Sequence, residues 1–423
     1  MTKVNRRTLV AGAAAAGIAA TALGGAKQAS AARQGGKTEL TMLHIWGTAP
    51  GGTPAAKPAP MTQVVDAFNA QSETVVINQS TPGGYYETLQ KTQADMAAGN
   101  APDIVSTPWA FLNYAVEGLG VNDIETVAGD QFAELKGLMK DSAWDLVNRD
   151  DKHYGMPWGL STPILYYNAD IFKAAGVDPK VVFSTWEAFA EAAPKLQVDG
   201  GPVISLQFNK DWPAQTIIQS NGGRVLNDDG SFGIASPEAI EAMQTIADLD
   251  KGGFYDRGLK PELRPSFIAG TTAVFQGSVA SLNGLRNECT FTLGTSTWPK
   301  FGEKPIVAST GGSFLGVYSF DESKYAAITE FFQFAAGEVG YPIWNQTGYI
   351  NMSSLELDRL EGQEPAYAQF DQGLILETNW PSSRGVEAGS TWDGYCERIW
   401  ANDIPVEEGV NAALAELKSI TGQ

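Results

Sequence analysis

Aromatic side chains are the residues of this chain whose types and spacing are best suited to chemistry. The 423 residues include 11 tryptophans, and the segment 153–187 alone holds Trp158, Tyr166, Tyr167 and Trp186. An indole or phenol ring offers a large flat face that stacks on other flat or apolar surfaces at a small cost in entropy. Rings of this kind hold a ligand by contact and do not transfer groups. The same rings can equally be core residues, and their types and spacing leave both roles open.

Motifs for group transfer are missing from the sequence. It contains no GxSxG nucleophile elbow, no phosphate-binding P-loop and no HExxH zinc helix. Its only two histidines, His44 and His153, leave little material for a zinc site or a histidine-dependent triad. A pair of carboxylates for glycoside hydrolysis stays open, although nothing in the sequence points to one. These absences argue against an enzyme and against a cofactor or metal, with a secreted glycoside-active enzyme kept as an alternative.

Composition limits the partners of the chain. Hydrophobic residues make up 43% and charged residues 18%, which is ordinary for a globular protein, and the length is enough for two domains. The formal net charge of −19 argues against nucleic acid or an anionic membrane as a partner. The two cysteines, Cys289 and Cys396, are too few for a disulfide framework, and the sequence leaves open whether they pair.

The first 31 residues are expected to be an export signal. A basic start that includes Lys3 precedes an apolar run at 9–23, and the small residues 29–31 fit a cleavage site. The run is too short and too weakly apolar for a membrane span. Residues 5–9, NRRTL, resemble a twin-arginine signal, with general secretion as the alternative. Cleavage would leave an exported, soluble protein in the periplasm or outside the cell, four charge units more negative than the whole chain.

Strand and helix patterns alternate along the chain. Alternating residues at 38–46 indicate an opening strand, followed by a helix at 61–69 and a second strand at 74–78. This order predicts a βαβ unit in a parallel sheet. After a helix at 85–98, a short buried strand carries Trp109 just beyond its carboxyl end, where ligands bind in open α/β sheets. Further helices are expected at 131–148, 212–220, 237–251, 323–336, 338–346, 353–360, 393–400 and 405–418.

The aromatic segment reads as a strand followed by two helices. Residues 160–168 are rich in β-branched and aromatic residues, and the last of them, an asparagine, suits the N-cap of a helix at 169–175. Gly176 fits the left-handed position after that helix. Ser184 is expected to open the next helix, in a capping box with Glu187.

Several sequence blocks, in their order and spacing, resemble a known family. The chain is similar to the extracellular solute-binding proteins that deliver sugars and related solutes to ABC importers, and among them most similar to the glycerol-3-phosphate-binding branch. The resemblance covers nearly all of the chain after the export signal. The blocks that carry it are GGYYETLQKTQADMAAGNAPDIV at 83–105, STPILYYNADIFKAAGVDP at 161–179, STWEAFAEAAPKL at 184–196, FIAGTTAVFQGSVASL at 267–282, GGSFLGVYS at 311–319 and WNQTGYIN at 344–351.

The resemblance implies an α/β, two-lobed periplasmic-binding-protein fold of type II. Each lobe would be a mixed sheet flanked by helices, with crossing strands between the lobes. Lobe I would comprise 38–161 and 297–340, and lobe II would comprise 162–296 and 341–423. The ligand, a carbohydrate of one to several units or a polyol, would be held between the lobes as they close and then passed to an ABC permease. We expect a monomer.

The resemblance also implies which residues contact the ligand. For most of them a purely structural role stays open: an aromatic ring can belong to the core, and a serine or glycine can serve a strand turn. The predicted ligand contacts are Trp46, Tyr86, Trp109, Ser161, Thr162, Trp186, Trp212, Ser278, Gly311, Gly312, Tyr349 and Arg384.

Two of these positions distinguish the candidate ligands. At Trp109 the glycerol-3-phosphate binders carry a glutamate that holds ligand hydroxyls, so a tryptophan there favours a sugar stacked on the indole. Arg384 lies in the segment where those binders place a phosphate-pairing arginine, which favours glycerol-3-phosphate or a glycerophosphodiester. A solvated loop arginine is the plainer interpretation of Arg384.

Overall fold

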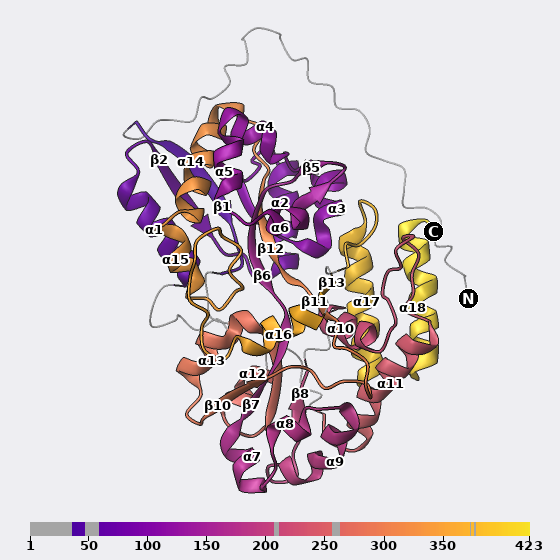
Figure 1. Cartoon of the computed structure of the whole chain (residues 1–423). Helices are drawn as coiled ribbons and strands as arrows, with labels where there is room; N and C mark the ends of the chain where they lie inside the picture. The colour runs from indigo at the N-terminus through magenta and orange to yellow at the C-terminus, as the bar shows by residue number, and fades with distance from the viewer. Residues whose placement is uncertain (1–35, 47–58, 207–210, 256–262, 373, 376–377) are drawn as a thin grey trace, which may run out of the picture. The chain divides into compact units, whose positions relative to one another are not determined.

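Two mixed β-sheets organise the chain (Figure 1). The computed structural model describes residues 36–46, 59–206, 211–255, 263–372, 374–375 and 378–423. The expected export signal, residues 1–31, lies outside the described residues. No helix in the described ranges has the length and apolar character needed to cross a membrane. Cys289 and Cys396 are not joined in a disulfide.

The first sheet has five strands in the order β2-β1-β3-β12-β6. β1 runs parallel to β2 and to β3, whereas β12 runs antiparallel to β3 and to β6. The parallel β1–β2 pair is joined by α1, which confirms the predicted βαβ unit. The strands are β1 (Thr38–Leu43), β2 (Val75–Ser80), β3 (Ile104–Pro108), β6 (Met156–Ser161) and β12 (Gly311–Val317).

The second sheet has four strands in the order β10-β7-β9-β8. β7 runs antiparallel to β10 and to β9, and β8 runs parallel to β9. Both sheets are therefore mixed, as predicted, and each takes its strands from the ranges expected for one lobe. The strands are β7 (Pro163–Asn168), β8 (Ile204–Ser205), β9 (Val274–Ser278) and β10 (Leu293–Ser296).

The chain passes from one sheet to the other at Thr162. β6 ends at Ser161 in the first sheet, and β7 begins at Pro163 in the second. Two short pairs lie outside both sheets: β4 (Asn148–Arg149) with β5 (Lys152–His153), and β11 (Ala308–Ser309) with β13 (Leu374–Ile375).

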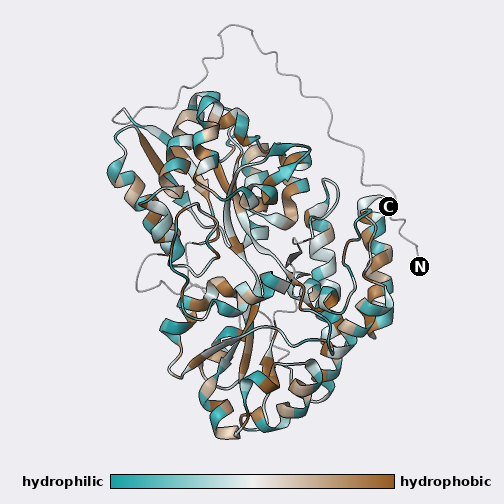
Figure 2. Cartoon of the chain, in the orientation of Figure 1, coloured by the Kyte–Doolittle hydropathy of each residue, from teal (hydrophilic) through white to brown (hydrophobic). Residues whose placement is uncertain are grey.

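Helices cover the strands because each helix buries an apolar stripe against them. α1, α2 and α14 pack on the first sheet, and α10, α12 and α16 pack on the second. Figure 2 shows hydrophobic residues gathered along the strands and hydrophilic ones on the outer sides of the helices. The helices are α1 (Pro60–Gln71), α2 (Tyr85–Ala97), α3 (Leu112–Tyr114), α4 (Ile124–Ala128), α5 (Phe132–Gly137), α6 (Asp141–Trp144), α7 (Ala169–Ala175), α8 (Pro179–Val182), α9 (Trp186–Leu196), α10 (Asp211–Ser220), α11 (Pro237–Lys251), α12 (Leu263–Ile268), α13 (Leu282–Glu288), α14 (Tyr325–Ala336), α15 (Gly340–Asn345), α16 (Glu364–Gln372), α17 (Gly385–Trp400) and α18 (Val406–Thr421). Shorter turns are η1 (Trp109–Phe111), η2 (Ala115–Leu119), η3 (Gly129–Gln131), η4 (Asp145–Val147), η5 (Val279–Ser281) and η6 (Glu322–Lys324).

Two predicted helices are wrong for the same reason. The expected helix at 131–148 is broken into short pieces, and 353–360 is not helical. Met139 and Ser353 form an antiparallel bridge, and the Lys140 N–H donates to the Met352 carbonyl at 2.9 Å. In this pairing, backbone N–H and C=O groups of the two segments bond to each other and not within a helix.

The expected capping box also differs by one residue. Asn168 caps α7 and Gly176 adopts the left-handed conformation after it, as predicted. At α9, however, the cap is Thr185, whose hydroxyl oxygen accepts from the Ala188 N–H at 3.1 Å. The Ser184 hydroxyl instead donates to the Val181 carbonyl at 2.6 Å, so it belongs to the end of the preceding turn.

α15 packs with the helices that cover the first sheet. α15 packs against α1 and α14, which cover the first sheet. Trp344 on α15 also lies against Trp46 and Trp158, which both belong to that part of the chain. Residues 340–345 therefore pack with the elements of the first sheet.

Candidate ligand-binding site

Three glycines on two neighbouring strands let backbone and aromatic rings approach closely, and they are called the glycine floor below. Gly159 lies on β6, and Gly311 and Gly312 open β12. Gly312 has φ of 117°, and a Cβ built on it would lie only 1.8 Å from the Gly159 carbonyl oxygen. Only glycine fits there, because the backbones approach too closely for any side chain. The floor thus lies where the chain crosses between its two sheets, with Gly159 and Gly311 buried and Gly312 partly exposed.

Three aromatic rings reach the edges of the glycine floor. Cβ atoms built on the three glycines would lie 3.2 Å from the Tyr349 ring, 3.5 Å from the Trp212 ring and 3.1 Å from Trp109 Nε1. The rings come from three separate elements: η1, α10 and the segment after α15. The fold therefore brings together five predicted residues, namely Trp109, Trp212, Gly311, Gly312 and Tyr349. Gly159 was not predicted, although a glycine inside a strand pattern is a known signal of close backbone approach.

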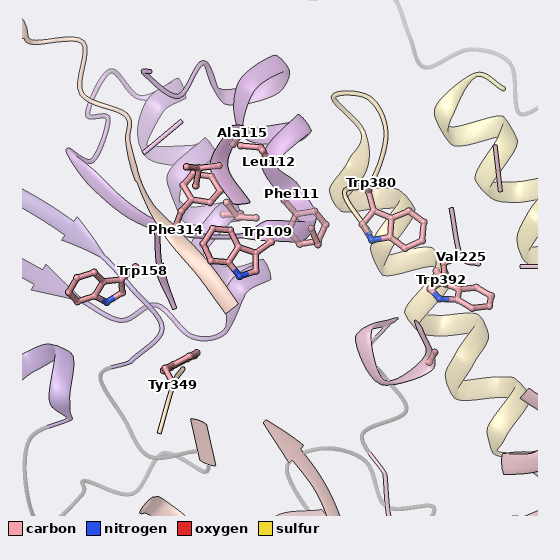
Figure 3. Close-up of a cluster of buried hydrophobic side chains, with 14 of the residues drawn as sticks. Trp109, Phe111, Leu112, Ala115, Trp158, Val225, Phe314, Tyr349, Trp380 and Trp392 are labelled. Atoms are coloured by element: carbon pink, nitrogen blue, oxygen red, sulfur yellow. The ribbon is translucent and has the colours of Figure 1, made fainter. Parts of the chain in front are cut away.

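Trp109 follows directly after β3, at the carboxyl end of that strand. Its Nε1–H donates to the Gly311 carbonyl at 3.2 Å, and its ring centroid lies 5.9 Å from that of Phe314. Figure 3 shows the indole between Phe314 and Phe111, with the side chain of Tyr349 nearby. The polar edge of the indole is therefore paired, and the residue is 4% exposed.

Tyr349 belongs to a cluster of rings at the end of β1. Its hydroxyl accepts from Trp46 Nε1–H at 3.2 Å, and its ring stacks on Trp344 with centroids 5.0 Å apart. Trp46 meets Trp344 edge-on at 4.9 Å. Burial raises the pKa of the Tyr349 hydroxyl above its usual range, so this group stays protonated and keeps its hydrogen-bonding ability at neutral pH. Trp344 was not predicted as part of the site.

Tyr86 reaches toward a different partner. Its hydroxyl donates to Asp393 Oδ2 on α17 at 3.0 Å, and its ring lies against Phe111 with centroids 5.5 Å apart. Nearby, the Trp380 N–H donates to the Ala110 carbonyl at 2.9 Å, and Figure 3 shows Trp380 and Trp392 on the side of α17. No sequence pattern points to Asp393 or Trp380, because both contacts join segments far apart in the chain.

The predicted hydroxyl residues lie where the chain crosses between the sheets. Ser161 pairs with Gly311 in the β6–β12 register. Thr162 is fully buried, and its hydroxyl accepts from Gln369 Nε2 at 3.4 Å. The Ser278 hydroxyl oxygen accepts from the Ala280 N–H at 3.1 Å, which caps η5. Ser161 thus adjoins the glycine floor, whereas the hydroxyls of Thr162 and Ser278 are engaged in local structure.

Trp186 and Arg384 are not brought to the glycine floor. Trp186 packs in the interior beside Trp298, with ring centroids 6.0 Å apart. Arg384 lies at the start of α17, where its Nε–H donates to Glu387 Oε2 at 2.7 Å and its side chain also donates to the Ile420 carbonyl. Its guanidinium is therefore directed toward the end of α18.

Comparison of the sequence with known protein families identifies one family that matches most of the chain. Residues 63–356 match the family described as bacterial extracellular solute-binding protein. The chain belongs to this family. As a member, it is a solute-binding protein of the kind that serves ABC importers. The resemblance predicted from the sequence blocks is confirmed.

A curated relative supports the branch that was predicted. The chain is 26% identical over 378 residues to the sn-glycerol-3-phosphate-binding periplasmic protein UgpB of Escherichia coli O1:K1 / APEC. The match covers 82% of this chain and 86% of the relative.

Two solved structures share the fold of this chain. One is the ABC substrate-binding protein Lmo0181 from Listeria monocytogenes in complex with cycloalternan, with a TM-score of 0.78, 21% identity, and 91% of this chain and 99% of that one covered. Another is UgpB from Mycobacterium tuberculosis in complex with glycerophosphocholine, with a TM-score of 0.76, 20% identity, and 89% and 97% covered. The predicted two-lobed α/β fold is confirmed.

Proposed function

We propose that the mature chain is the exported solute-binding component of an ABC importer and that it binds a neutral carbohydrate, of one to several units, between its two lobes. It acts as a monomer, without a cofactor, and hands the sugar unchanged to the permease subunits. Ligand contacts with both lobes favour the closed state, so the affinity for the ligand sets the degree of closure. In this proposal, lobe I comprises residues 38–161 and 297–345, and lobe II comprises residues 162–296 and 346–423.

The setting of Trp109 carries this proposal. The position where the glycerol-3-phosphate binders hold a carboxylate has an indole whose N–H is already paired with Gly311. Together with Trp212 and Tyr349, it packs on the glycine floor. Such a site suits a sugar, because its C–H faces stack on rings while its hydroxyls bond to backbone groups. The proposed contacts are Trp46, Trp109, Ser161, Trp212, Gly311, Gly312 and Tyr349.

The second candidate ligand is glycerol-3-phosphate or a glycerophosphodiester. The similarity to UgpB proteins favours it, including the one solved with glycerophosphocholine. A phosphate needs a cationic partner for tight binding, and Arg384 is the residue predicted for this role. That guanidinium pairs with Glu387 and the Ile420 carbonyl, so it would have to leave both partners first.

A thermal-shift screen of the mature chain separates the two ligands. The panel holds maltose, maltotriose, a cyclic tetrasaccharide, glycerol-3-phosphate and glycerophosphocholine, each up to millimolar concentration. A ligand at a hundredfold excess over its Kd adds about 2.7 kcal/mol of stability, which is readily measured. We expect stabilisation by at least one neutral sugar and little by either phosphate.

Two results would count against the proposal. Stabilisation by the two phosphate compounds alone would show that the ligand is the second candidate and not a neutral sugar. The protein is also incubated with an oligosaccharide for hours, and the mixture is analysed by chromatography. Release of smaller sugars would show that the protein is an enzyme. Isothermal titration of the best ligand should give one site per chain.

A further inference from the structure

His44 lies directly before the cluster of rings at the end of β1. Its backbone N–H donates to the Ser80 carbonyl at 3.0 Å, which continues the pairing of β1 with β2 by one residue. Its side chain is fully buried. Two residues later, Trp46 has left the sheet and reaches Tyr349. His44 therefore sits at the point where the strand becomes part of the candidate site.

The hydrogen bonds of His44 define which nitrogen carries the proton. The Trp46 backbone N–H is a donor and lies 3.1 Å from Nδ1, so Nδ1 must accept. Nε2 then carries the hydrogen and donates to Gln79 Oε1 at 2.8 Å. Burial lowers the pKa of His44 to about 4, so the neutral ring that this arrangement requires is present at neutral pH. The side chain closes a turn onto the backbone two residues on, as an asparagine does in an Asx turn.

Trp46 is thereby held at three points. Its backbone N–H is bonded to His44, and its ring stacks on the imidazole with centroids 5.9 Å apart and planes 23° apart. Its Nε1–H is bonded to the Tyr349 hydroxyl. A partly exposed indole fixed in this way has little conformational freedom left to lose when a ligand stacks on it.

We propose that His44 is a positioning residue that fixes Trp46 as a stacking platform for the sugar, an inference that rests on the proposed function. His44 does not touch the ligand. It acts through the turn that it closes and through the face that it offers to the indole, and Gln79 orients it from β2. Pre-organisation of this kind raises affinity by removing the ordering cost from the binding step.

Fluorine NMR of the mature chain labelled with 5-fluorotryptophan tests the positioning itself, without any ligand. Trp46→Phe assigns the Trp46 resonance. His44→Phe keeps a flat ring but removes both hydrogen bonds, and we expect the Trp46 resonance to shift and broaden. His44→Asn keeps an acceptor for the Trp46 N–H, and we expect the resonance to return close to that of the unchanged protein. His153→Phe is the matched control, since that histidine lies against Trp144 and should move only the Trp144 resonance.

Titration with maltose, maltotriose and glycerophosphocholine tests the consequence for binding. We expect His44→Phe to weaken sugar binding about fivefold to tenfold and His44→Asn to stay within about twofold of the unchanged protein. An unmoved Trp46 resonance in His44→Phe overturns the inference. So does a moved resonance with unchanged affinity, which would leave the proposed function standing. If no probe binds the unchanged protein, the proposed function fails, and with it the role of Trp46 as a platform.

Discussion

Two groups of tryptophans in this chain look alike in composition but differ in what surrounds them. One is the interior cluster of Trp186, Phe189, Trp298 and Phe301, in which rings pack on other rings. Trp298 Nε1–H donates to the Pro163 carbonyl there, so its polar edge is used within the core. The other group surrounds the glycine floor, where Trp109 packs on the Phe314 ring and on the backbone of the glycines.

The difference is one of neighbours, not of residue type. An indole enclosed by side chains contributes its buried area to folding. An indole beside the glycines packs on main chain, and the proposed function assigns it a ligand contact as well. Substitutions in the interior cluster should therefore reduce stability, and those around the floor should reduce binding.

The largest effect is expected in the interior cluster. Trp186 is 2% exposed, and Trp186→Ala should lower the free energy of unfolding by about 3–5 kcal/mol, because it leaves a cavity among rings. Urea unfolding measures this loss. The folded fraction should bind sugar with unchanged affinity. A tenfold loss of affinity without loss of stability would move Trp186 into the site and erase the distinction between the two groups.

Acid should affect the region of the floor through His44. Its pKa is about 4 in the folded chain and about 6.5 when unfolded, so only the unfolded state takes up a proton between these values. The contribution of His44 to the free energy of unfolding is fully present above pH 6.5. It falls as the pH drops from 6.5 toward 4, and below pH 4 it no longer changes. The loss is on the order of 3 kcal/mol.

His44→Asn is the variant that checks this assignment. It cannot titrate in this range, so its stability should change less between pH 6.5 and 4 in urea unfolding series. Carboxylates with lowered pKa, such as Asp123 and Asp248, lose their contribution only at lower pH and serve as an internal reference. Equal slopes for both proteins between pH 6.5 and 4 would exclude His44 as the cause.

Around the floor, Trp109→Ala should weaken binding of a neutral sugar by tenfold or more, which is about 1.4 kcal/mol. Calorimetric titration gives the affinity, and Trp109→Phe is the control that keeps a flat ring. Trp109 is also buried, so both variants need a thermal melt to show that they fold. Unchanged affinity in a folded Trp109→Ala protein would remove this residue from the site.

Most of the fold could be predicted from local patterns. Asn168 and Gly176 mark both ends of α7 in sequence and in structure, because caps depend on residues next to the helix. The failures at 131–148 and 353–360 arise from the bridge between Met139 and Ser353, a contact between segments that no local pattern relates. Local chemistry was overridden by tertiary pairing at both places.

The candidate site was less predictable than the fold, because the role of each residue depends on a partner that is distant in the sequence. Trp109 could be named from its place after a strand, since chain order alone puts it at the sheet edge. Trp186 follows an equally plausible pattern and lies in the interior. The roles of Asp393 and His44 depend on Tyr86 and Trp46 as partners, and those distances exist only in the folded chain.

The smallest effect is expected at Arg384, and it separates the two candidate ligands. Its side chain is 53% exposed and pairs with Glu387, and an exposed pair of this kind contributes about 0–1 kcal/mol to stability. Arg384→Ala should therefore leave the thermal midpoint and the affinity for a neutral sugar nearly unchanged, within about twofold. Glu387→Gln is the matched control, because it frees the guanidinium without removing it. If glycerophosphocholine binds, and binds more tightly after Glu387→Gln but hardly at all after Arg384→Ala, the arginine serves a phosphate. That result would mean that the ligand is a glycerophosphodiester and that Trp109 contributes less to binding than Arg384.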